Sequence, residues 1–292
     1  MEKLISNLAD INDWIDSAPD VGSFRSKSEF MTFVVEMMNR SLYLLRVGAA
    51  LCPDELSTGK GFSKRKAVVA GHIVRMAKLY QGVLIHTADR KIELSSIFDR
   101  LLFETIVRAE YFMKSKNRSL AQYVLISYKP EKEMLSYLES EAKTRPLIQI
   151  EKRMKRKMKE KLKKDGVPIK KLMANRQWNL DGKDFRRLMT EVGYGPMYAF
   201  SFGCSSHQIH GDWFDISTMH LKKEGRYYTP DLSWGDSDPR SSVPHTIQCL
   251  SVLLRYIKWS KTDPDKVITP IIAKMINLAR EVDVAHEATL TS

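Results

Sequence analysis

The chain has 292 residues, of which 43% are hydrophobic and 28% are charged, and this is the composition of a globular protein. Lysine and arginine outnumber aspartate and glutamate by 47 to 35, which gives a formal net charge of +12. This composition excludes a largely disordered chain, and three scattered cysteines are too few for a disulfide framework. No segment shows the apolar core of a signal peptide or the roughly 18 uncharged apolar residues of a membrane span. We therefore expect a cytoplasmic protein that does not bind a membrane.

Apolar residues recur at spacings of three and four along most of the chain, and this pattern predicts helices. Ser26 and Glu29 have the spacing of a capping box at the start of the first long helix. The predicted helices cover residues 26–50, 64–86, 94–114, 120–128, 131–143, 184–192, 197–210, 245–258 and 265–284. We find no repeat and no convincing strand. The predicted fold class is all-α: an irregular helical bundle with a projecting basic helix and a long polar loop.

Two segments without apolar periodicity divide this pattern. A loop around Pro53, Gly59 and Gly61 follows the first long helix, so that residues 1–60 are expected to pack as N-terminal helices on a core domain of residues 61–292. The polar segment 222–244 is rich in Pro, Gly, Ser and Asp and is longer than an ordinary connection, which favours a functional or disordered loop.

The positive charge is concentrated in one basic arm at about residues 147–171. Residues 151–171 contain eleven Lys or Arg and three acids, so 11 − 3 = +8 of the net +12 lies there. Such a helix suits the phosphates of a nucleic acid or an acidic protein surface, whereas a merely solvated helix is the alternative. The candidate nucleic-acid-binding residues are Lys152, Arg153, Lys155, Arg156, Lys157, Lys159, Lys161, Lys163 and Lys164. Trp178, Tyr227, Tyr228 and Trp234 are the aromatic residues that could add base stacking.

A first polar constellation lies within the apolar helix 94–114. Arg100, Glu104 and Arg108 follow one another at four-residue spacing, so they form one stripe on the helix. Buried charges need partners, and an internal ion pair that fixes helix register is one interpretation. The other is a polar pocket wall with Glu104 as base and Arg100 as anion binder.

A second constellation runs from Tyr198 to Trp213. Ser206 and His210 are one helical turn apart, and Gly211 is placed to end the helix. His207 and His210 could act as general acid and base near neutral pH. Together with Cys204 they could also hold zinc, but their spacing is not that of a standard zinc site, and we expect neither metal nor cofactor. A Ser206–His210 nucleophile pair lacks the Gly-x-Ser-x-Gly turn of serine hydrolases.

Two further pairs have the arginine–histidine spacing found in a class of helical ribonucleases. Arg65 precedes His72 by seven positions, and Arg240 precedes His245 by five, across Pro244 at the end of the polar loop. Spacings of this kind arise often by chance, so neither pair decides the function.

The order of these motifs resembles the bacterial family catalogued as domain of unknown function 5677. The likeness rests on Arg100-Leu-Leu-Phe-Glu104, on Trp178 with Asn-Leu-Asp-Gly182 after it, on Tyr198, and on the Ser206-x3-His210-Gly211 turn, over about residues 65–220. The basic segment between the motifs and His207 depart from the pattern. The resemblance implies a helical protein in which the Arg/Glu helix faces the Ser/His helix, and it implies no activity.

Two functions remain open from the sequence. In the first, the chain acts on RNA as a metal-independent ribonuclease of toxin or phage-defence type, with acid–base chemistry by Glu104, His207 and His210 and a cation from Arg100. Ser206 and Tyr198 complete that candidate site. In the second, the chain is a non-catalytic helical binding module that docks nucleic acid or an acidic protein through the basic arm. A homo-oligomer is an open alternative in both.

Overall fold

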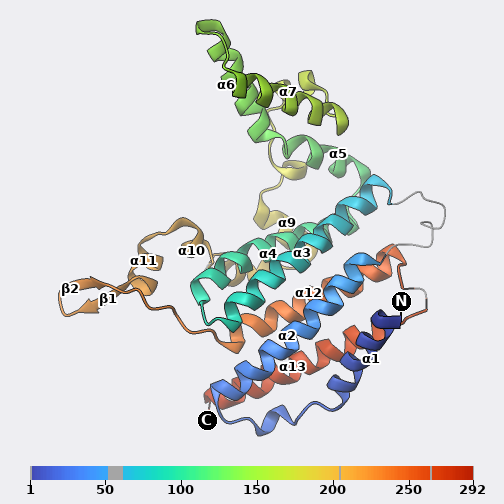
Figure 1. Cartoon of the computed structure of the whole chain (residues 1–292), viewed down its shortest axis with the longest axis vertical. Coiled ribbons are helices and arrows are strands. Elements are labelled where there is room, and N and C mark those ends of the chain that lie inside the picture. Colours follow the sequence, from blue (N-terminus) through green and yellow to red (C-terminus); the bar gives the residue numbers. More distant parts are fainter. Residues whose placement is uncertain (1, 52–61, 204, 264, 292) are drawn as a thin grey trace. The chain divides into compact units, whose positions relative to one another are not determined.

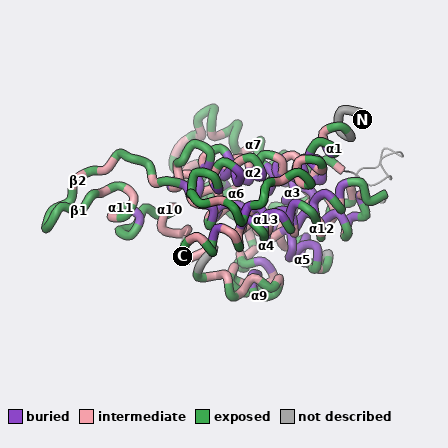
Figure 2. Tube along the Cα trace, turned by 90° about the horizontal axis from the view of Figure 1, so that it is seen from below, coloured by how far each residue is buried: buried purple, intermediate pink, exposed green. Residues whose placement is uncertain are grey.

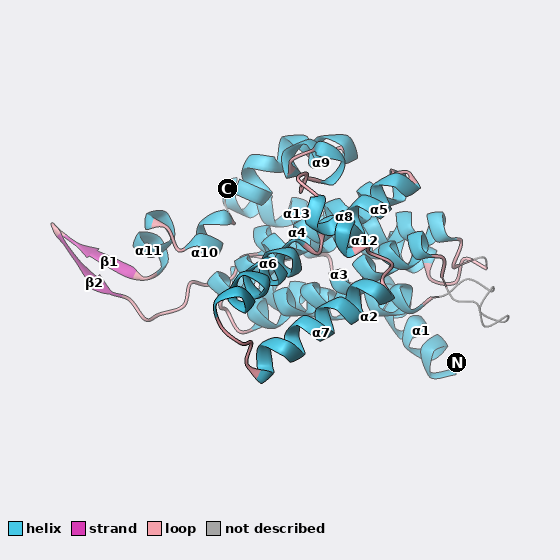
Figure 3. Ribbon diagram, turned by 90° about the horizontal axis from the view of Figure 1, so that it is seen from above, coloured by secondary structure: helices cyan, strands magenta, loops and turns pink. Residues whose placement is uncertain are grey.

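The computed structural model describes residues 2–51, 62–203, 205–263 and 265–291. Helices dominate these ranges, and one small hairpin is the only sheet in them (Figures 1 and 3). The all-α fold class is therefore confirmed. The chain forms two compact units: unit 1 joins residues 1–113 to 192–292, and unit 2 is the segment 114–191 between them. The predicted loop at Pro53, Gly59 and Gly61 lies outside the described residues.

Unit 1 consists of long helices and a series of short elements. The long helices are α1 (Glu2–Asp16), α2 (Lys27–Ala50), α3 (Lys64–Ala88), α4 (Ile92–Lys114), α12 (Pro239–Ser260) and α13 (Thr269–Thr291). The short elements are 3-10 turns at Val21–Ser23 and Gly195–Met197, a π-helix at Tyr198–Gly203, α10 (Ser206–His210), α11 (Trp213–Met219), β1 (Leu221–Glu224) and β2 (Tyr227–Pro230).

The core of unit 1 is built around α12, which packs against α2, α3 and α13 (Figure 1). Buried segments concentrate along these helices (Figure 2). The Tyr80 and Thr246 hydroxyls join α3 to α12 at 2.6 Å within this core. Gly48 lets α2 approach α12 closely, because a Cβ atom there would lie 2.6 Å from Leu253 Cδ1. The core is therefore filled by large side chains, and at Gly48 the two helices α2 and α12 pack in direct contact.

The first long helix begins as its sequence predicts. The Ser26 hydroxyl accepts a hydrogen bond from the Glu29 backbone N–H, and the Glu29 carboxylate accepts one from the Ser26 backbone N–H. Two of the N–H groups that the helix itself cannot satisfy are thereby paired, and the capping box is confirmed.

One helix has the length and apolar composition of a membrane span. In α3, the most apolar 18-residue window is half buried within the structure. The core helix of a globular protein has these same properties, and Val69, Ile73, Met76 and Tyr80 of α3 are buried in unit 1.

Unit 2 is a smaller assembly of short helices with its own apolar cluster. It contains α5 (Asn117–Ile126), α6 (Lys129–Thr144), α7 (Gln149–Lys164), α8 (Ile169–Ala174), a 3-10 turn at Leu180–Gly182 and most of α9 (Phe185–Val192). The cluster joins α5, α6, α7 and α8 through Leu125, Tyr128, Leu135, Leu162, Val167 and Leu172. The basic segment is therefore a helix, α7, anchored by one fully buried leucine, Leu162.

The structure differs from the sequence prediction at three places in unit 1. The segment 222–244 contains all but the first residue of the antiparallel β1–β2 hairpin. The two-residue loop of the hairpin begins with Gly225 at φ +63°, the geometry that tight hairpin turns require. The predicted helix 197–210 is broken into a 3-10 turn, a π-helix and α10. Helix α12 begins at Pro239, because proline is tolerated in the first turn and the Asp238 carboxylate caps the helix.

Candidate functional site

The Arg100 side chain joins the two constellations that the sequence singled out. Its Nε donates to Glu104 Oε1 at 3.2 Å along α4, and its Nη1 donates to the Ser206 hydroxyl and to the Phe202 carbonyl. The Ser206 hydroxyl also donates to the Phe202 carbonyl at 2.8 Å. Only 12% of the Arg100 side chain is exposed. Residues more than 100 positions apart thus meet in one polar cluster of unit 1.

The backbone at this cluster has an unusual conformation. Phe202 belongs to the π-helix Tyr198–Gly203, a rare element that is frequent at functional sites. The Phe202 ring lies against the Arg100 guanidinium and packs on the Tyr198 ring in a tilted arrangement, with ring centroids 5.1 Å apart. Tyr198 therefore reaches the cluster through Phe202. Arg108 contacts Glu104 only at 3.5 Å and is 41% exposed, so it lies at the edge of the cluster.

His207 faces α11 and is oriented by a carboxylate. Its Nδ1 lies 2.6 Å from Asp212 Oδ2, while Asp212 Oδ1 accepts the backbone N–H groups of Phe214 and Asp215 at the start of α11. The bond to His207 is the largest cause that lowers the pKa of Asp212. With Nδ1 held in this way, Nε2 is the nitrogen that can exchange protons. Asp212 was missed by the sequence analysis, although an Asp before an apolar run is a recognisable helix cap.

His210 ends α10 on the surface. The following residue, Gly211, has φ +57° and caps the helix, as predicted. His210 is exposed and makes no polar side-chain contact among the described residues. The structure therefore joins Arg100, Glu104 and Ser206 directly and Tyr198 through Phe202. Within the described residues, no hydrogen bond joins His207 or His210 to that cluster.

The helices α4 and α12 share a second, buried polar pair. His245 Nε2 lies 3.3 Å from Asp99 Oδ1, and both side chains are more than 85% covered. Burial alone lowers the pKa of His245, but the charge of Asp99 and its hydrogen bond outweigh burial and raise the pKa overall. Burial also raises the pKa of the Cys249 thiol, and Asp99 adds to this. The thiol is therefore protonated and unreactive at neutral pH.

A third polar contact joins α4 and α12 near their other ends. The Arg255 guanidinium donates to Glu110 and, at 3.1 Å, to the Tyr194 hydroxyl. Burial is the main cause that raises the pKa of Tyr194 to about 12. The residues from Tyr194 to Ser206 thus contact α4 at Phe103 and Arg100 and contact α12 at Gln248 and Arg255.

The two arginine–histidine spacings do not form joint sites. Arg240 and His245 both lie within α12, and Arg240 is bound to the cap residue Asp238 at 2.9 Å, whereas His245 is bound to Asp99. The placement of this pair across a loop end was therefore wrong. Arg65 donates to the Met113 carbonyl at 3.2 Å, while His72 Nδ1 lies 2.8 Å from the Val68 carbonyl.

The predicted nucleic-acid surface lies in unit 2 on α7. One side of the helix faces the apolar cluster with Leu162 and Met158. Three of its cations have acidic partners: Lys155 with Glu139, Arg156 with Glu160 and Lys161 with Asp165. Six are exposed and have no acidic partner among the described residues: Lys152, Arg153, Lys157, Lys159, Lys163 and Lys164.

An ion pair between Arg145 and Glu151 fixes the start of α7. Arg145 binds Glu151 through two nitrogens, at 2.9 and 2.7 Å, and Glu151 also accepts the Ile148 N–H. The bond to Arg145 is the main cause that lowers the pKa of Glu151 to about 2. Next to it, a concave surface of about 400 Å³ is lined by Gln149, Ile150, Lys152, Arg153 and Arg156.

Trp178 also belongs to unit 2. It packs on the apolar cluster with Met158 and accepts a cation–π contact from Lys132 at 5.2 Å. Its place in that cluster explains its presence without a base-stacking function.

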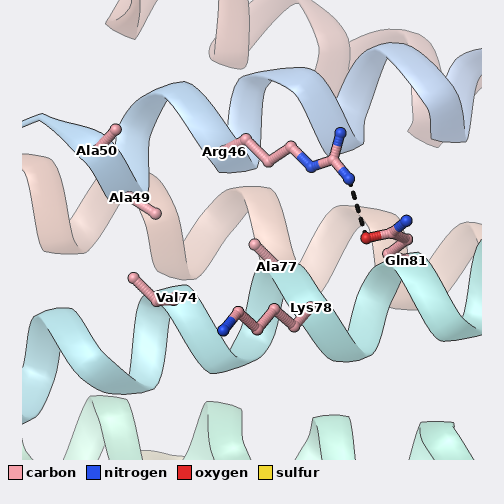
Figure 4. Close-up of a pocket in the computed structure, with 7 residues that line it drawn as sticks. All are labelled: Arg46, Ala49, Ala50, Val74, Ala77, Lys78 and Gln81. Carbon is pink, nitrogen blue, oxygen red and sulfur yellow. Dashed lines mark hydrogen bonds between the residues drawn. The ribbon is translucent and has the colours of Figure 1, made fainter.

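One pocket of unit 1 has no counterpart among the sequence motifs. It has a volume of about 300 Å³ and lies between α2 and α3 (Figure 4). Ala49, Ala50 and Ala77 give it a shallow floor, and Arg46 donates to Gln81 Oε1 at 2.9 Å across it. Short side chains rather than a polar motif create this hollow, so no pattern in the sequence points to it.

The described residues contain no group of three or more His, Cys, Asp or Glu side chains placed to hold a metal ion. Cys204, which the zinc alternative needs, lies outside them.

A model of one protein family matches residues 66–228, a range that holds the Arg100 cluster, α7 and the hairpin as far as Tyr228. The chain belongs to the family of unknown function DUF5677. This confirms the resemblance inferred from the Arg/Glu and Ser/His motifs. No curated protein matches the chain, and no solved structure does.

Proposed function

We propose that this DUF5677 protein binds RNA and that α7 is its docking surface. The observation that carries the proposal is the arrangement of cations along one side of that helix. Lys152, Arg156, Lys159 and Lys163 occupy positions i, i+4, i+7 and i+11, so they form a single stripe. At about 1.5 Å per residue the stripe is about 16 Å long, enough to meet several successive phosphates.

The rest of α7 supports this use of the stripe. Leu162 anchors the helix in unit 2, and the Arg145–Glu151 pair fixes its start, so the cations are presented on an ordered element. Three of the four, Lys152, Lys159 and Lys163, have no acidic partner among the described residues, and binding them to phosphate breaks no ion pair.

The test is the dependence of RNA affinity on salt. Replacing Lys152, Arg156, Lys159 and Lys163 by Gln should weaken binding and reduce the slope of log affinity against log salt by about 0.7 for each phosphate that is no longer neutralised. The matched control replaces four exposed cations of unit 1, Lys78, Lys258, Lys261 and Arg280, by Gln. It removes the same net charge but should leave the slope nearly unchanged. Equal effects of the two variants would show that only bulk charge matters and would refute docking at α7.

A ribonuclease activity is the second candidate, and the Arg100 cluster favours it. In that reaction Glu104 takes the proton of a ribose 2′-hydroxyl, the oxygen attacks phosphorus, and the 5′-oxygen leaves with a proton from His207 or His210. Arg100 would stabilise the charge on the phosphate, and the products would be a cyclic phosphate and a 5′-hydroxyl end. A toxin or phage-defence role would follow from this activity and not from RNA binding alone.

His210 gives the cleanest test of this second candidate, because it is exposed and its replacement should not disturb the fold. His210→Gln should lower RNA cleavage at an unchanged melting temperature if His210 is the acid. Asp212→Asn, which keeps a side chain that can cap α11, should lower cleavage if His207 is the acid. If the purified protein leaves structured and single-stranded RNA intact, the binding function stands alone. If both variants cleave like the wild type, neither histidine is the general acid.

A further inference from the structure

In addition to α7 of unit 2, a surface of unit 1 has the chemistry of a nucleic-acid contact. Residues 206–235, which we call the aromatic arm, comprise α10, α11 and the hairpin (Figure 3). The arm begins and ends on α4: Ser206 is bound to Arg100, and Gly235 N–H donates to Glu93 Oε1 at 2.9 Å while its carbonyl accepts the Ile92 N–H. Both ends of the arm are therefore fixed by hydrogen bonds to one rigid helix.

Large apolar side chains of the arm are strongly exposed. The exposed fractions are 62% for Trp213, 43% for Tyr228, 78% for Tyr227 and 52% for Trp234. Single exposed apolar residues need no explanation, but a group of them on one element marks an interaction surface. Aromatic residues in particular favour partners that offer flat rings together with polar groups.

The hairpin register places a cation beside one of these rings, and a second ring packs against the first. Lys223 pairs with Tyr228 across the strands, so the two side chains lie on the same face of the hairpin. The Trp213 ring meets Tyr228 edge to face, with ring centroids 5.5 Å apart. We call Trp213, Tyr228 and Lys223 the stacking face. Tyr227 pairs with Glu224 and lies on the opposite face.

Within the described part of the chain, two of the three cations of the arm have no acidic partner. Its four carboxylates all have partners within the arm: Asp212 with His207, Asp215 with His220, Asp231 with Lys222, and Glu224 with Thr229. Lys223 and Arg226 are exposed and have no acidic partner among the described residues. The arm has three Lys or Arg against four acids, so attraction for phosphate comes from these two side chains and not from net charge.

We propose that the stacking face binds the bases of single-stranded RNA, with Lys223 and Arg226 on the adjoining phosphates. The inference deepens the proposed RNA-binding function, on which it rests. Rings that stack on bases and a few cations along the backbone are the two elements of single-strand recognition, and stacking tolerates any base sequence. A duplex hides the flat faces of its bases within the helix, so the stacking face selects single strands.

The experiment measures the affinity of the full chain for a labelled uridine oligonucleotide and for an RNA duplex of the same length, over a series of salt concentrations. Trp213→Ala and Tyr228→Ala should each weaken binding of the single strand by about fivefold or more. The loss should be the same at every salt concentration, and duplex binding should not change. Tyr227→Ala, on the opposite face, and Tyr137→Ala, at an exposed ring on α6, are the matched controls and should change affinity by less than about twofold.

Each outcome separates this proposal from the one on which it rests. If the α7 variant flattens the salt dependence while Trp213→Ala and Tyr228→Ala bind like the wild type, the stacking face is refuted and α7 stands. If only the arm variants weaken binding, the stacking face stands and docking at α7 is refuted. If the wild type binds neither RNA, both fail. Equal losses for single strand and duplex would refute base stacking with single strands, and a change in oligomeric state that accompanies the loss would show that the face contacts a second copy of the chain.

Discussion

Arg100 combines more functions than any other residue of the candidate site. It holds Glu104 one turn away on its own helix and both the hydroxyl and the carbonyl that shape the turn at Phe202 and Ser206. A planar guanidinium with five N–H donors can satisfy all of these acceptors at once, whereas a lysine ammonium could not do so in the same geometry.

Removing this side chain should destabilise unit 1. We expect Arg100→Ala to lower the free energy of unfolding by about 1–3 kcal/mol, because it removes a charged donor from Glu104, from the Ser206 hydroxyl and from the Phe202 carbonyl. Arg108→Ala removes a neighbouring arginine that contacts Glu104 only at 3.5 Å and should cost less than about 1 kcal/mol. Urea denaturation of the two variants checks the difference, and equal stabilities would contradict the assigned role of Arg100.

The Asp99–His245 pair predicts a pH dependence with a definite sign. The folded-state pKa of His245 is raised above the ordinary value of 6.5. Its stabilising contribution is therefore complete below about pH 6.5 and is lost as pH rises through the folded-state pKa. Chemical denaturation over this range should show a decline in stability that Asp99→Asn flattens. Asp89→Asn, at an exposed carboxylate, should retain it. An unchanged decline in Asp99→Asn would assign the pH dependence to other groups.

At the scale of elements, the sequence predicts long helices and misses interruptions. The helices α2, α3 and α4 follow from periodicity because each has a continuous apolar face and, in α2, a capping box. The breaks between residues 197 and 210 do not follow from it, because the π-helix is held by the contact of Phe202 with Arg100, which is distant in sequence. The hairpin was missed because its Lys, Glu and Tyr residues do not alternate between apolar and polar.

The candidate site was also predictable from the sequence only in part. The sequence pointed to the joining of Arg100, Glu104 and Ser206 through the order of family motifs, and the contacts were found where these motifs meet. The partners of the histidines were not predictable from spacing. His207 depends on the helix start at Asp212, and His245 depends on how α12 packs against α4.

Two glycines on neighbouring helices give opposite predictions. In α2, a Cβ at position 48 would clash with Leu253, so Gly48→Ala should destabilise the protein by about 1–3 kcal/mol through overpacking. In α3, a Cβ at position 71 meets nothing within 4 Å, so Gly71→Ala should stabilise it by about 0.5–1 kcal/mol through helix propensity. Thermal denaturation distinguishes the two. A stabilised Gly48→Ala variant would show that α2 and α12 can move apart without cost.

At the scale of the whole molecule, the two units have separate apolar cores. The core of unit 1 is formed by α2, α3, α12 and α13, and that of unit 2 by residues between Leu125 and Leu172. Compact units with separate cores unfold in separate steps when few interactions couple them.

Calorimetry can test this independence with a single buried residue. Leu162→Ala should lower the stability of unit 2 by about 2–5 kcal/mol, because the leucine is fully buried in its cluster. The transition of unit 1 should remain in place. Met154→Ala, at a side chain of the same helix that is 38% exposed, should shift neither transition strongly. A single transition that moves as a whole in Leu162→Ala would contradict two cooperative units.

The insertion of unit 2 within unit 1 has a consequence for synthesis on the ribosome. Helices α2, α3 and α4 emerge early, but the helix at the centre of their core, α12, ends at Ser260. Roughly 150 residues must be translated after α4 before the core can close, which takes about 7–30 s at ordinary elongation rates. During that interval unit 2 can fold completely, whereas the apolar faces of α2, α3 and α4 remain exposed to solvent. We therefore expect the nascent chain to fold from its middle outward, with the apolar faces of its first half exposed the longest.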